Sequence, residues 1–257
     1  MKLSQFRFDF PLNLIAQTPT KRREDARLMV VHKDTGLIEN KTFSHFTELL
    51  ADNALLNQAQ HAIISSVVEG LHEFYEKLSE VLPIHLFTDK TKIPLINLYQ
   101  SISTLGSDRI AAAVGAYSLY PNRNVLVIDA GTCIKYNFTN AHNEYLGGGI
   151  SPGIHMKFKA LNQFTSKLPL IEVDASFTDL VGVNTQQSIL SGVLNGSVAE
   201  VDGIINHYQQ QYANLICLLT GGDGEYLANR LKNSIFAHQN LILIGLNTIL
   251  EYHLENN

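Results

Sequence analysis

The stretch VLVIDAGTCIKYN, residues 125–137, places Asp129 at the end of an apolar, β-branched run and follows it at once with Gly131 and Thr132. The run before Asp129 is typical of a buried strand, and residues 133–138 continue as a second strand. We therefore predict a tight hairpin whose tip presents a carboxylate, a flexible glycine and a hydroxyl group, the parts of a phosphate-binding turn. The simpler alternative is a hairpin in which Asp129 only hydrogen-bonds its own turn.

The composition around this stretch is that of a folded globular protein. Of the 257 residues, 45% are hydrophobic and 17% are charged, as in folded globular proteins. The length suits one large domain or two of ordinary size. The net charge of −5 argues against a nucleic-acid surface. No apolar run reaches the roughly 18 to 20 residues that span a bilayer, and the N-terminus lacks the pattern of a signal peptide. We expect a cytoplasmic protein that binds neither nucleic acid nor membrane.

Cysteine, histidine and clustered basic residues give no sign of a site. Cys133 and Cys217 both fall in predicted strands, so we expect small buried apolar side chains rather than a disulfide or a metal site. The ten histidines show no metal-ligand spacing. The basic cluster Lys21, Arg22 and Arg23 is interpreted as a solvated loop.

Strand and helix patterns alternate along the chain and favour a mixed α/β fold. Strands are predicted at residues 27–31, 37–43, 61–68, 84–87, 215–220 and from Val125 onward. Helices are predicted at residues 46–58, 71–81, 107–119, 154–164, 188–211, from Glu225, and at 245–253. The helix at 107–119 is expected to be capped by Ser107 or Asp108 and stopped by Pro121. Because two blocks each open with strands and close with helices, we predict a duplicated architecture with a cleft between halves near residue 120.

Four polar or glycine-rich loops fall at strand ends or helix starts: GSDR at 106–109, DAGT at 129–132, GGGISPG at 147–153 and TGGDG at 220–224. In the first, Asp108 could take a proton from a substrate hydroxyl while Arg109 holds an anionic group. The alternative is a capping aspartate beside a surface arginine.

The two glycine-rich loops also allow two interpretations each. GGGISPG lets backbone amides approach a ligand, but a plain hairpin followed by a helix start explains it equally well. TGGDG after a buried strand is the stronger signal, because its glycines allow a nucleotide to lie over the following helix N-terminus. It also fits a degenerate dinucleotide loop, although the G-x-G-x-x-G spacing is absent.

Taken in order, these motifs resemble type III pantothenate kinase, a family of the acetate and sugar kinase, Hsp70 and actin superfamily. The matching segments cover roughly residues 60–257: SSVV from Ser65, Tyr99, GSDR, VIDAGTCIKYNF, YLGGGISPG, NTQQSILSG from Asn184, and TGGDGEYLANRL. The resemblance implies two ribonuclease H-like, actin-like ATPase domains, residues 1–120 and 121–257, around a central cleft. It also implies a homodimer with its substrate site near the subunit interface.

The same resemblance implies ATP-dependent phosphorylation of pantothenate to 4′-phosphopantothenate, the first step of coenzyme A biosynthesis. Asp108 would be the general base, and Tyr99, Gly106, Ser107, Asp108, Arg109 and Thr185 would hold pantothenate. Thr132, Gly221 and Gly222 would contact ATP. Asp129 would bind a monovalent cation, potassium or ammonium, and Mg²⁺ would also be required. Such parts suit phosphoryl transfer, which needs positioning and charge neutralisation more than covalent chemistry.

The N-terminus departs from the family pattern, which opens with a strand and the phosphate loop D-x-G-N-T. Here Asp9 and Phe10 are followed by Pro11, whose φ is fixed and which has no amide to donate to a phosphate. Either the phosphate loop has been lost, or the functional N-terminus is a different one; Asp9 could still serve if the loop rearranges. Losing several contacts worth roughly 1.5 to 3 kcal/mol each would depress turnover by many powers of ten.

This departure leaves a second hypothesis open: a catalytically impaired family member that binds pantothenate or a nucleotide and acts as a regulatory protein through a partner. A third, another small-hydroxyl kinase of the same superfamily, is disfavoured because Tyr99 and Thr185 stand where pantothenate contacts are expected.

Overall fold

The computed structural model describes residues 60–65, 76, 79, 80 and 82–256, and the backbone of two strands at 27–31 and 38–42. Contacts divide the chain into two compact units, residues 1–62 with 69–84, and residues 63–68 with 85–257. The boundary predicted at residue 120 does not coincide with this division and stays a prediction. Asp9, the helix predicted at 46–58 and nearly all of the one at 71–81 lie outside the described residues.

Two short pairs of strands precede the main sheet. Strands β1 (Arg27–Val31) and β2 (Ile38–Thr42) pair antiparallel, with Arg27 opposite Thr42, which confirms the two strands predicted at 27–31 and 37–43. Strands β3 (Ala62–Ile64) and β4 (Ile84–Leu86) form a second two-stranded sheet. Both fall within predicted strands.

The second unit is built on a seven-stranded sheet in the order β11-β10-β6-β7-β8-β5, with β9 paired to β7. The strands are β5 (Ile96–Asn97), β6 (Val125–Ala130), β7 (Cys133–Thr139), β8 (Glu144–Gly147), β9 (Ile150–Pro152), β10 (Ile216–Thr220) and β11 (Phe236–Ala237). The predicted hairpin is β6–β7, with Asp129 directly opposite Lys135. Strand β10 runs parallel to β6, so Thr220 lies beside Asp129 where both strands end.

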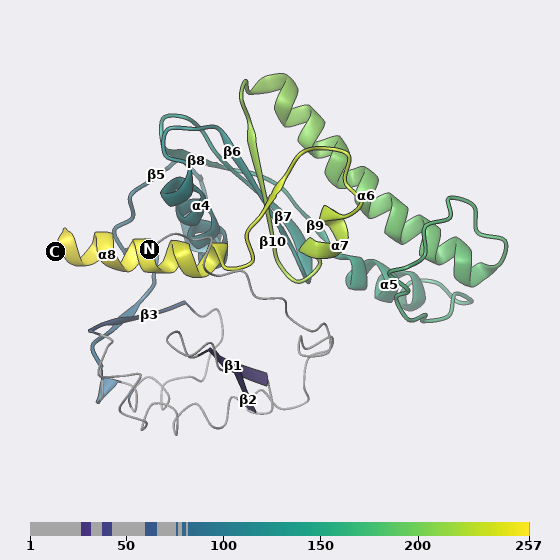
Figure 1. Cartoon of the computed structure of the whole chain (residues 1–257), viewed down its shortest axis with the longest axis horizontal. Helices are drawn as coiled ribbons and strands as arrows, with labels where there is room; N and C mark the ends of the chain where they lie inside the picture. The colour runs from purple at the N-terminus through teal and green to yellow at the C-terminus, as the bar shows by residue number, and fades with distance from the viewer. Residues whose placement is uncertain are drawn as a thin grey trace. The chain divides into compact units, whose positions relative to one another are not determined.

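Helices cover both faces of this sheet (Figure 1). They are α4 (Ser107–Leu119), α5 (Ile154–Gln163), α6 (Thr185–Gln211), α7 (Gly224–Ala228) and α8 (Leu241–Glu255), with a 3₁₀ turn at Ile102–Thr104. Side chains of β6 alternate as a strand requires. Val125 and Val127 pack with α4 and α8, whereas Leu126 and Ile128 pack with α6 on the opposite face. Asp129 continues the first series, so it faces α4.

Helices α4 and α8 cross closely because two glycines meet at the crossing. A Cβ atom on Gly115 would collide with the carbonyl oxygen of Leu241, and one on Gly245 with that of Ala111. Ala111, Ala112, Ala113 and Ala116 of α4 are fully or almost fully buried, so small side chains make up much of its packed surface. The crossing therefore fixes α4, whose first turn carries the GSDR motif.

The predicted cap of α4 was wrong. The N-cap residue is Gly106, which has no side chain to supply a cap. The Ser107 hydroxyl instead accepts a hydrogen bond from the Ser65 hydroxyl at 2.7 Å, and Asp108 Oδ1 accepts one from the Arg109 amide at 2.8 Å. Helix α6 starts three residues earlier than predicted because Asn184 caps it, accepting from the Gln187 amide at 2.9 Å.

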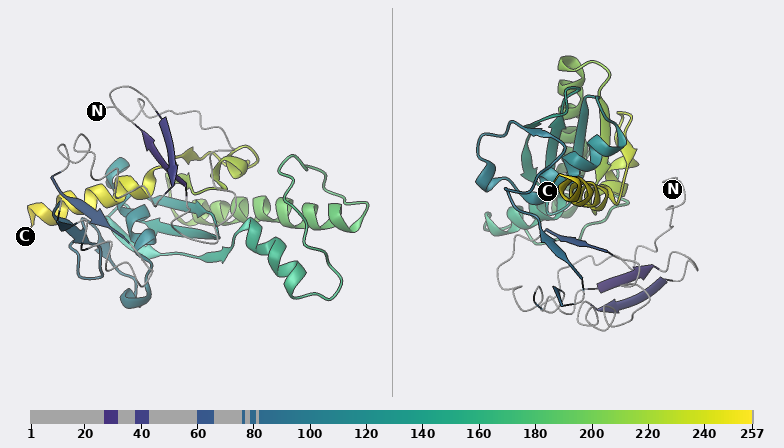
Figure 2. Two further views of the ribbon diagram at one scale, coloured as in Figure 1. Left: turned by 90° about the horizontal axis from the view of Figure 1, so that it is seen from below. Right: turned by 90° about the vertical axis from the view of Figure 1, so that its left-hand side faces the viewer.

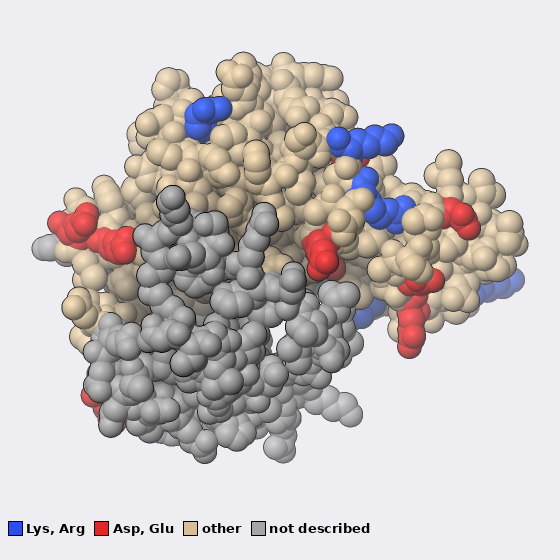
Figure 3. Space-filling model, viewed as in Figure 1, with Lys and Arg blue, Asp and Glu red and all other residues tan. Residues whose placement is uncertain are grey.

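The surface and the cysteines complete the description. On the face shown in Figure 3, acidic and basic side chains are scattered and interspersed over the described part. None of the helices within the described ranges is long and apolar enough to cross a bilayer. Cys217 is buried in β10 and Cys133 partly buried in β7, which confirms the predicted strand positions, and both thiols are free.

Candidate functional site

The β6–β7 hairpin brings all four predicted loops together. The carbonyl group of Thr132 accepts a hydrogen bond from the Gly153 amide at 3.0 Å, which joins the GGGISPG segment to the hairpin tip. The carbonyl group of Ala130 accepts one from the Asp223 amide at 3.0 Å, which joins the TGGDG loop. Lys135 joins the fourth loop, GSDR, through its side chain. Part of the GGGISPG segment is itself strand β9, which pairs with β7.

Lys135 lies between the two aspartates that the sequence singled out. Its Nζ atom is 2.5 Å from Asp108 Oδ2 and 2.7 Å from Asp129 Oδ2. The Asp129 side chain is 10% exposed and that of Asp108 44% exposed, so the first carboxylate is sheltered and the second faces solvent. Burial by itself lowers the pKa of Lys135, but hydrogen bonds and charge attraction from the two aspartates outweigh it and raise the pKa. Lys135 therefore remains protonated and positively charged in this cluster.

Strand alternation explains why these side chains meet. In β7, Ile134, Tyr136 and Phe138 belong to the apolar core on the α6 face. Lys135 and Asn137 therefore point to the opposite face, where α4 packs against β6 and β7. The first turn of α4 then lies over them and adds Asp108 and Arg109 to the cluster.

Arg109 is a buried side chain, held by the same face of β7. It is 5% exposed; its Nε donates to Asn137 Oδ1 at 2.7 Å and one terminal nitrogen donates to the Tyr136 carbonyl group at 3.4 Å. The guanidinium carbon lies 5.5 Å from the centre of the Tyr99 ring, a cation–π distance. The sequence left open a surface arginine here, and burial excludes that alternative.

Two neighbours extend this cluster. Tyr145 donates its hydroxyl to Asn137 Oδ1 at 3.0 Å, so Asn137 accepts from two side chains at once. Burial raises the pKa of Tyr145 to about 12, while the nearby Arg109 charge acts in the opposite direction. The amide nitrogen Nδ2 of Asn137 is buried and has no hydrogen-bond partner in the described part of the chain. Because a buried donor without an acceptor is costly, this corner is suited to an oxygen-bearing ligand or a water molecule.

Beyond the hairpin tip, the glycines of two loops leave space. A Cβ atom on Gly131 or on Gly222 would meet no atom within 4 Å, and Thr132 is exposed. Gly221 has a φ of +93°, and a Cβ there would collide with the backbone of Ala130, so only glycine lets the two loops pack together. Gly131 and Gly222 therefore leave open space beside the hairpin tip.

Asp223 adds an acidic group next to these glycines. Its Oδ2 atom is buried without a hydrogen-bond partner in the described residues. Burial raises its pKa, and the charge of His155 acts in the opposite direction. An unpartnered carboxylate oxygen of this kind is a candidate acceptor for a hydroxyl group.

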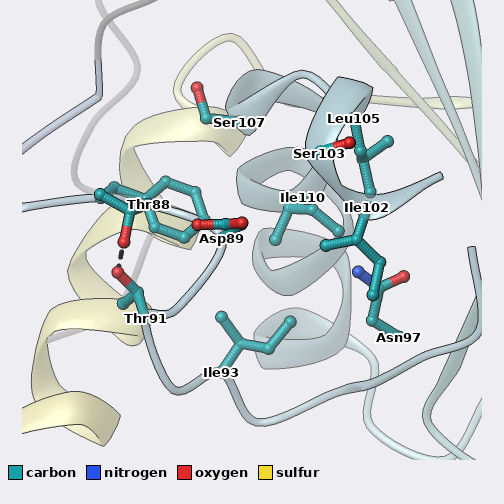
Figure 4. A pocket seen from close by; sticks show the side chains of 11 residues that line it. Thr88, Asp89, Thr91, Ile93, Asn97, Ile102, Ser103, Leu105, Ser107 and Ile110 are labelled. Carbon is teal, nitrogen blue, oxygen red and sulfur yellow. Dashed lines mark hydrogen bonds between the residues drawn. The ribbon is translucent and has the colours of Figure 1, made fainter.

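A cavity of about 330 Å³ adjoins the start of α4 (Figure 4). Its walls combine apolar side chains such as Ile93, Ile102 and Ile110 with the polar side chains of Asn97 and Ser107. The volume lies in the range of small-molecule pockets. Of the predicted site residues that the structure describes, Ser107 alone lines it.

Thr185 is not brought to this cluster within one chain. It is the first residue of α6 and is exposed. Figures 1 and 2 show the start of α6 extending beyond the sheet, at the end of the second unit opposite α4 and β5. The structure therefore gathers Tyr99, Gly106, Asp108 and Arg109 in one place and leaves Thr185 apart.

A network on the α6 face supports β7 from behind. Glu200 accepts hydrogen bonds from the Tyr136 hydroxyl at 3.0 Å, from Lys157 Nζ at 2.6 Å and from the Ser151 hydroxyl. Burial acts to raise the pKa of Glu200, but its bonds to Lys157, Ser151 and Tyr136 outweigh this and lower it. The network ties α5, α6, β7 and β9 together without reaching the Asp108 cluster.

The described part of the chain contains no ready-made cluster of metal ligands. Among its residues no three His, Cys, Asp or Glu side chains lie close enough together to hold a metal ion. Asp129, the residue expected to bind a monovalent cation, has Lys135 against its carboxylate instead. In this structure the Asp129 carboxylate is therefore paired with an ammonium group of the chain itself.

Sequence reasoning missed Lys135, Asn137, Tyr145 and Asp223. One signal was present for the first two. Lys135, Asn137 and Thr139 alternate with Ile134, Tyr136 and Phe138, which marks one face of an otherwise apolar strand as polar. The sequence gives no comparable signal for Tyr145, whose partner Asn137 lies on the neighbouring strand β7.

Comparisons with known proteins agree with the resemblance seen in the motifs. A family model described as type III pantothenate kinase matches residues 18–207. A type III pantothenate kinase of Flavobacterium johnsoniae is 42% identical over 194 residues, which cover 76% of this chain and 79% of that protein. One from Cytophaga hutchinsonii is 42% identical over 214 residues, which cover 83% of this chain and 89% of the other. The family match starts beyond Asp9.

A solved structure supports the fold. A Campylobacter jejuni protein whose description names the Baf family of transcriptional activators superposes with a TM-score of 0.55. It is 23% identical, and the match covers 85% of this chain and 92% of that one. At this identity the likeness concerns the fold alone, and it agrees with the α/β class predicted from the sequence.

Proposed function

This chain belongs to the type III pantothenate kinase family, and we propose that it transfers the terminal phosphoryl group of ATP to the hydroxyl group of pantothenate. The product is 4′-phosphopantothenate, in the first step of coenzyme A biosynthesis. The observation that carries the proposal is the convergence of the four loops on the β6–β7 hairpin, with Asp108 and Asp129 on either side of Lys135. The names of the relatives favour this activity over a regulatory protein that has lost it.

Asp108 is the general base in this proposal. Its carboxylate is partly exposed, so a substrate hydroxyl group can reach it, and it accepts from Lys135 and from the Arg109 amide. Those contacts hold the carboxylate in a fixed position, as a general base requires. The hydroxyl oxygen bonds to the γ-phosphorus while its proton passes to Asp108. The bond between the γ-phosphorus and the bridging oxygen breaks, and ADP leaves.

Arg109 and Tyr99 are the proposed anchors for pantothenate. An arginine has five N–H donors, and the two hydrogen bonds to Asn137 and Tyr136 leave others for the carboxylate of the substrate. The Tyr99 ring lies against the guanidinium group and limits its motion. Gly106 and Ser107 would contribute contacts from the start of α4.

ATP is placed along the hairpin tip and the TGGDG loop. Thr132 would contact the phosphates, Gly222 leaves room for the nucleotide beside Asp223, and Gly221 lets the loop pack against Ala130. The phosphate contact expected of Asp9 lies outside the described residues and stays a prediction. Magnesium would then arrive with the ATP phosphates, because Mg²⁺ keeps most of its waters and needs few protein ligands.

A second copy of the chain would supply Thr185. This residue lies away from Asp108 in its own chain, and the segment before it exposes large apolar side chains. Leu180 is 79% exposed and Val183 83% exposed, and Phe164 at the end of α5 is 80% exposed. Apolar side chains this exposed are suited to burial against another protein surface. A homodimer that places Thr185 at the partner's Asp108 cluster fits both facts.

A cytoplasmic location remains a prediction from the sequence.

The test is an assay of ADP release with pantothenate and MgATP, comparing the wild type with Asp108→Asn. Asparagine keeps an oxygen for the Arg109 amide but cannot accept the proton, so turnover should fall by roughly 10² to 10⁴. Asp202→Asn is the matched control, because Asp202 Oδ1 also accepts a backbone amide, that of Lys232 at 3.1 Å. If Asp108→Asn turns over at the wild-type rate, the role of Asp108 is refuted. If the wild-type protein binds pantothenate but shows no turnover, the proposed activity is refuted.

A further inference from the structure

We propose that the ammonium group of Lys135 takes the place of the monovalent cation expected at Asp129, a role that rests on the proposed kinase function. Phosphoryl transfer by this chain would then need neither potassium nor ammonium. The Nζ atom lies 2.7 Å from Asp129 Oδ2 and 2.5 Å from Asp108 Oδ2, so one tethered cation serves both carboxylates.

The pairing is built into the hairpin. Asp129 and Lys135 are directly opposite each other in the antiparallel ladder of β6 and β7. Opposite residues on one face have neighbouring Cβ atoms, so their side chains meet whenever the two strands pair. The six paired positions of this ladder, from Val125 opposite Thr139 to Ala130 opposite Ile134, fix the register. The register therefore keeps Lys135 next to Asp129 in the ladder.

The charge balance works against a second cation. A free ion at Asp129 would share this carboxylate with Lys135 and lie very close to its ammonium group. Like charges at such a separation repel strongly where solvent is partly excluded, and the Asp129 side chain is 10% exposed. An ammonium group carried by the chain also neutralises charge without taking an ion from solution.

The position suits the chemistry of the site. Phosphoryl transfer is assisted by positive charge near the transferred group. Lys135 lies between the proposed base and the hairpin tip, where the phosphate chain of ATP is placed. An ammonium has three donors, and the two hydrogen-bond partners found for it in the described residues are Asp108 and Asp129.

Cation binding is measured directly, using thallium(I) as a probe for potassium, by ²⁰⁵Tl nuclear magnetic resonance on the full chain. The proteins compared are the wild type, Lys135→Met and the control Lys157→Met. Lys157 is a fair control because its side chain is 22% exposed against 21% for Lys135, and it pairs with Glu200 at 2.6 Å away from the cluster. Circular dichroism checks that each variant is folded.

The wild type and Lys157→Met should show no saturable thallium binding, whereas Lys135→Met should bind thallium and release it to potassium. Saturable binding by the wild type, competed by potassium, would overturn the proposal because the site then accepts an ion despite Lys135. Absence of binding by a folded Lys135→Met would also overturn it, since the two carboxylates would then form no cation site. If Lys135→Met does not fold, Lys135→Gln takes its place, and the wild-type result still decides.

Turnover is measured separately, in potassium chloride and in choline chloride at equal ionic strength. Wild-type turnover should differ by less than about twofold between the two salts, and Lys135→Met should gain a potassium stimulation of about tenfold or more. Strong potassium activation of the wild type would contradict the proposal. A chain with no turnover in either salt would refute the proposed kinase function, while the thallium measurement would still decide the role of Lys135.

Discussion

The guanidinium Nε of Arg109 donates to Asn137 Oδ1 at 2.7 Å, and neither side chain is more than 5% exposed. This contact links the first turn of α4 to the face of β7 on which Lys135 lies. A buried charged group depends on its acceptor more than an exposed one does, because water cannot replace the lost bond. Asn137 therefore helps to hold the first turn of α4 against β7 at the site.

Replacing Asn137 by alanine should destabilise the protein by about 3 kcal/mol, since a charged hydrogen bond is worth roughly 1.5 to 3 kcal/mol and the Tyr145 hydroxyl also loses its acceptor. Tyr145→Phe removes only the neutral bond and should cost about 1 kcal/mol. Urea unfolding of both variants measures the difference. Equal losses in the two variants would show that the bond to Arg109 does not carry this stability.

Arg109→Lys should weaken pantothenate binding by roughly tenfold or more, because lysine lacks the planar fork that can bond Asn137 and a carboxylate together. ATP binding should change little. Arg230→Lys is the control, since Arg230 also lies over a tyrosine ring, that of Tyr226 at 5.3 Å, outside the cluster. Calorimetric titration with each ligand provides the measurement, and equal pantothenate affinity in wild type and Arg109→Lys would exclude Arg109 as an anchor.

The crossing of α4 and α8 should tolerate no side chain at its two glycines. Gly115→Ala or Gly245→Ala forces a methyl group against backbone atoms and should destabilise the fold by about 1 to 3 kcal/mol. Gly203→Ala in α6 meets no atom within 4 Å and should stabilise the protein by about 0.5 to 1 kcal/mol through helix propensity. Thermal unfolding of the three variants shows whether each substitution destabilises or stabilises the protein. A neutral Gly115→Ala would mean that the helices can separate without cost.

Stability should fall as the pH drops below about 6.5, the usual pKa of histidine. Burial and the neighbouring His253 lower the pKa of His85, and burial lowers that of His238. The unfolded chain, with the higher pKa, then binds more protons in this window, so protonation favours unfolding and stability is complete above pH 6.5. Melting temperatures between pH 5.5 and 7.5 test this. The double variant His85→Gln with His238→Gln should show a weaker dependence of melting temperature on pH. An unchanged slope would mean that other groups cause the pH dependence.

Hybrid dimers test the contribution of Thr185 from a second copy. Asp108→Asn and Thr185→Trp should each be inactive alone, because one lacks the base and the other blocks the partner's site. In a mixed dimer one site carries both changes and the other is intact, so random pairing should restore roughly a quarter of wild-type turnover. Co-expression of the two chains with different tags allows the hybrid to be purified. No recovery above the two parent proteins would place Thr185 in its own chain's site, or outside the site.

Local sequence determined much of the fold because the decisive signals are short-range. The alternation in residues 125–137 predicts the β6–β7 hairpin, and the glycine-rich and polar segments predict four loops at strand ends or helix starts. The start of α4 was also predicted, although its cap was wrong: Ser107 and Asp108 are cap-forming residues, but their side chains serve Ser65, Lys135 and the Arg109 amide instead. Tertiary partners outcompeted the local preference.

The tertiary structure alone decided what those loops become together. Lys135 and Asp108 are 27 residues apart, and Arg109 and Asn137 are 28 apart, so no local pattern shows that they touch. They meet because strand alternation turns one face of β7 toward α4, and because two glycines let α8 hold α4 close to the sheet. Sequence thus determined which residues carry charge and which segments form strands, whereas packing determined that one lysine neutralises two aspartates.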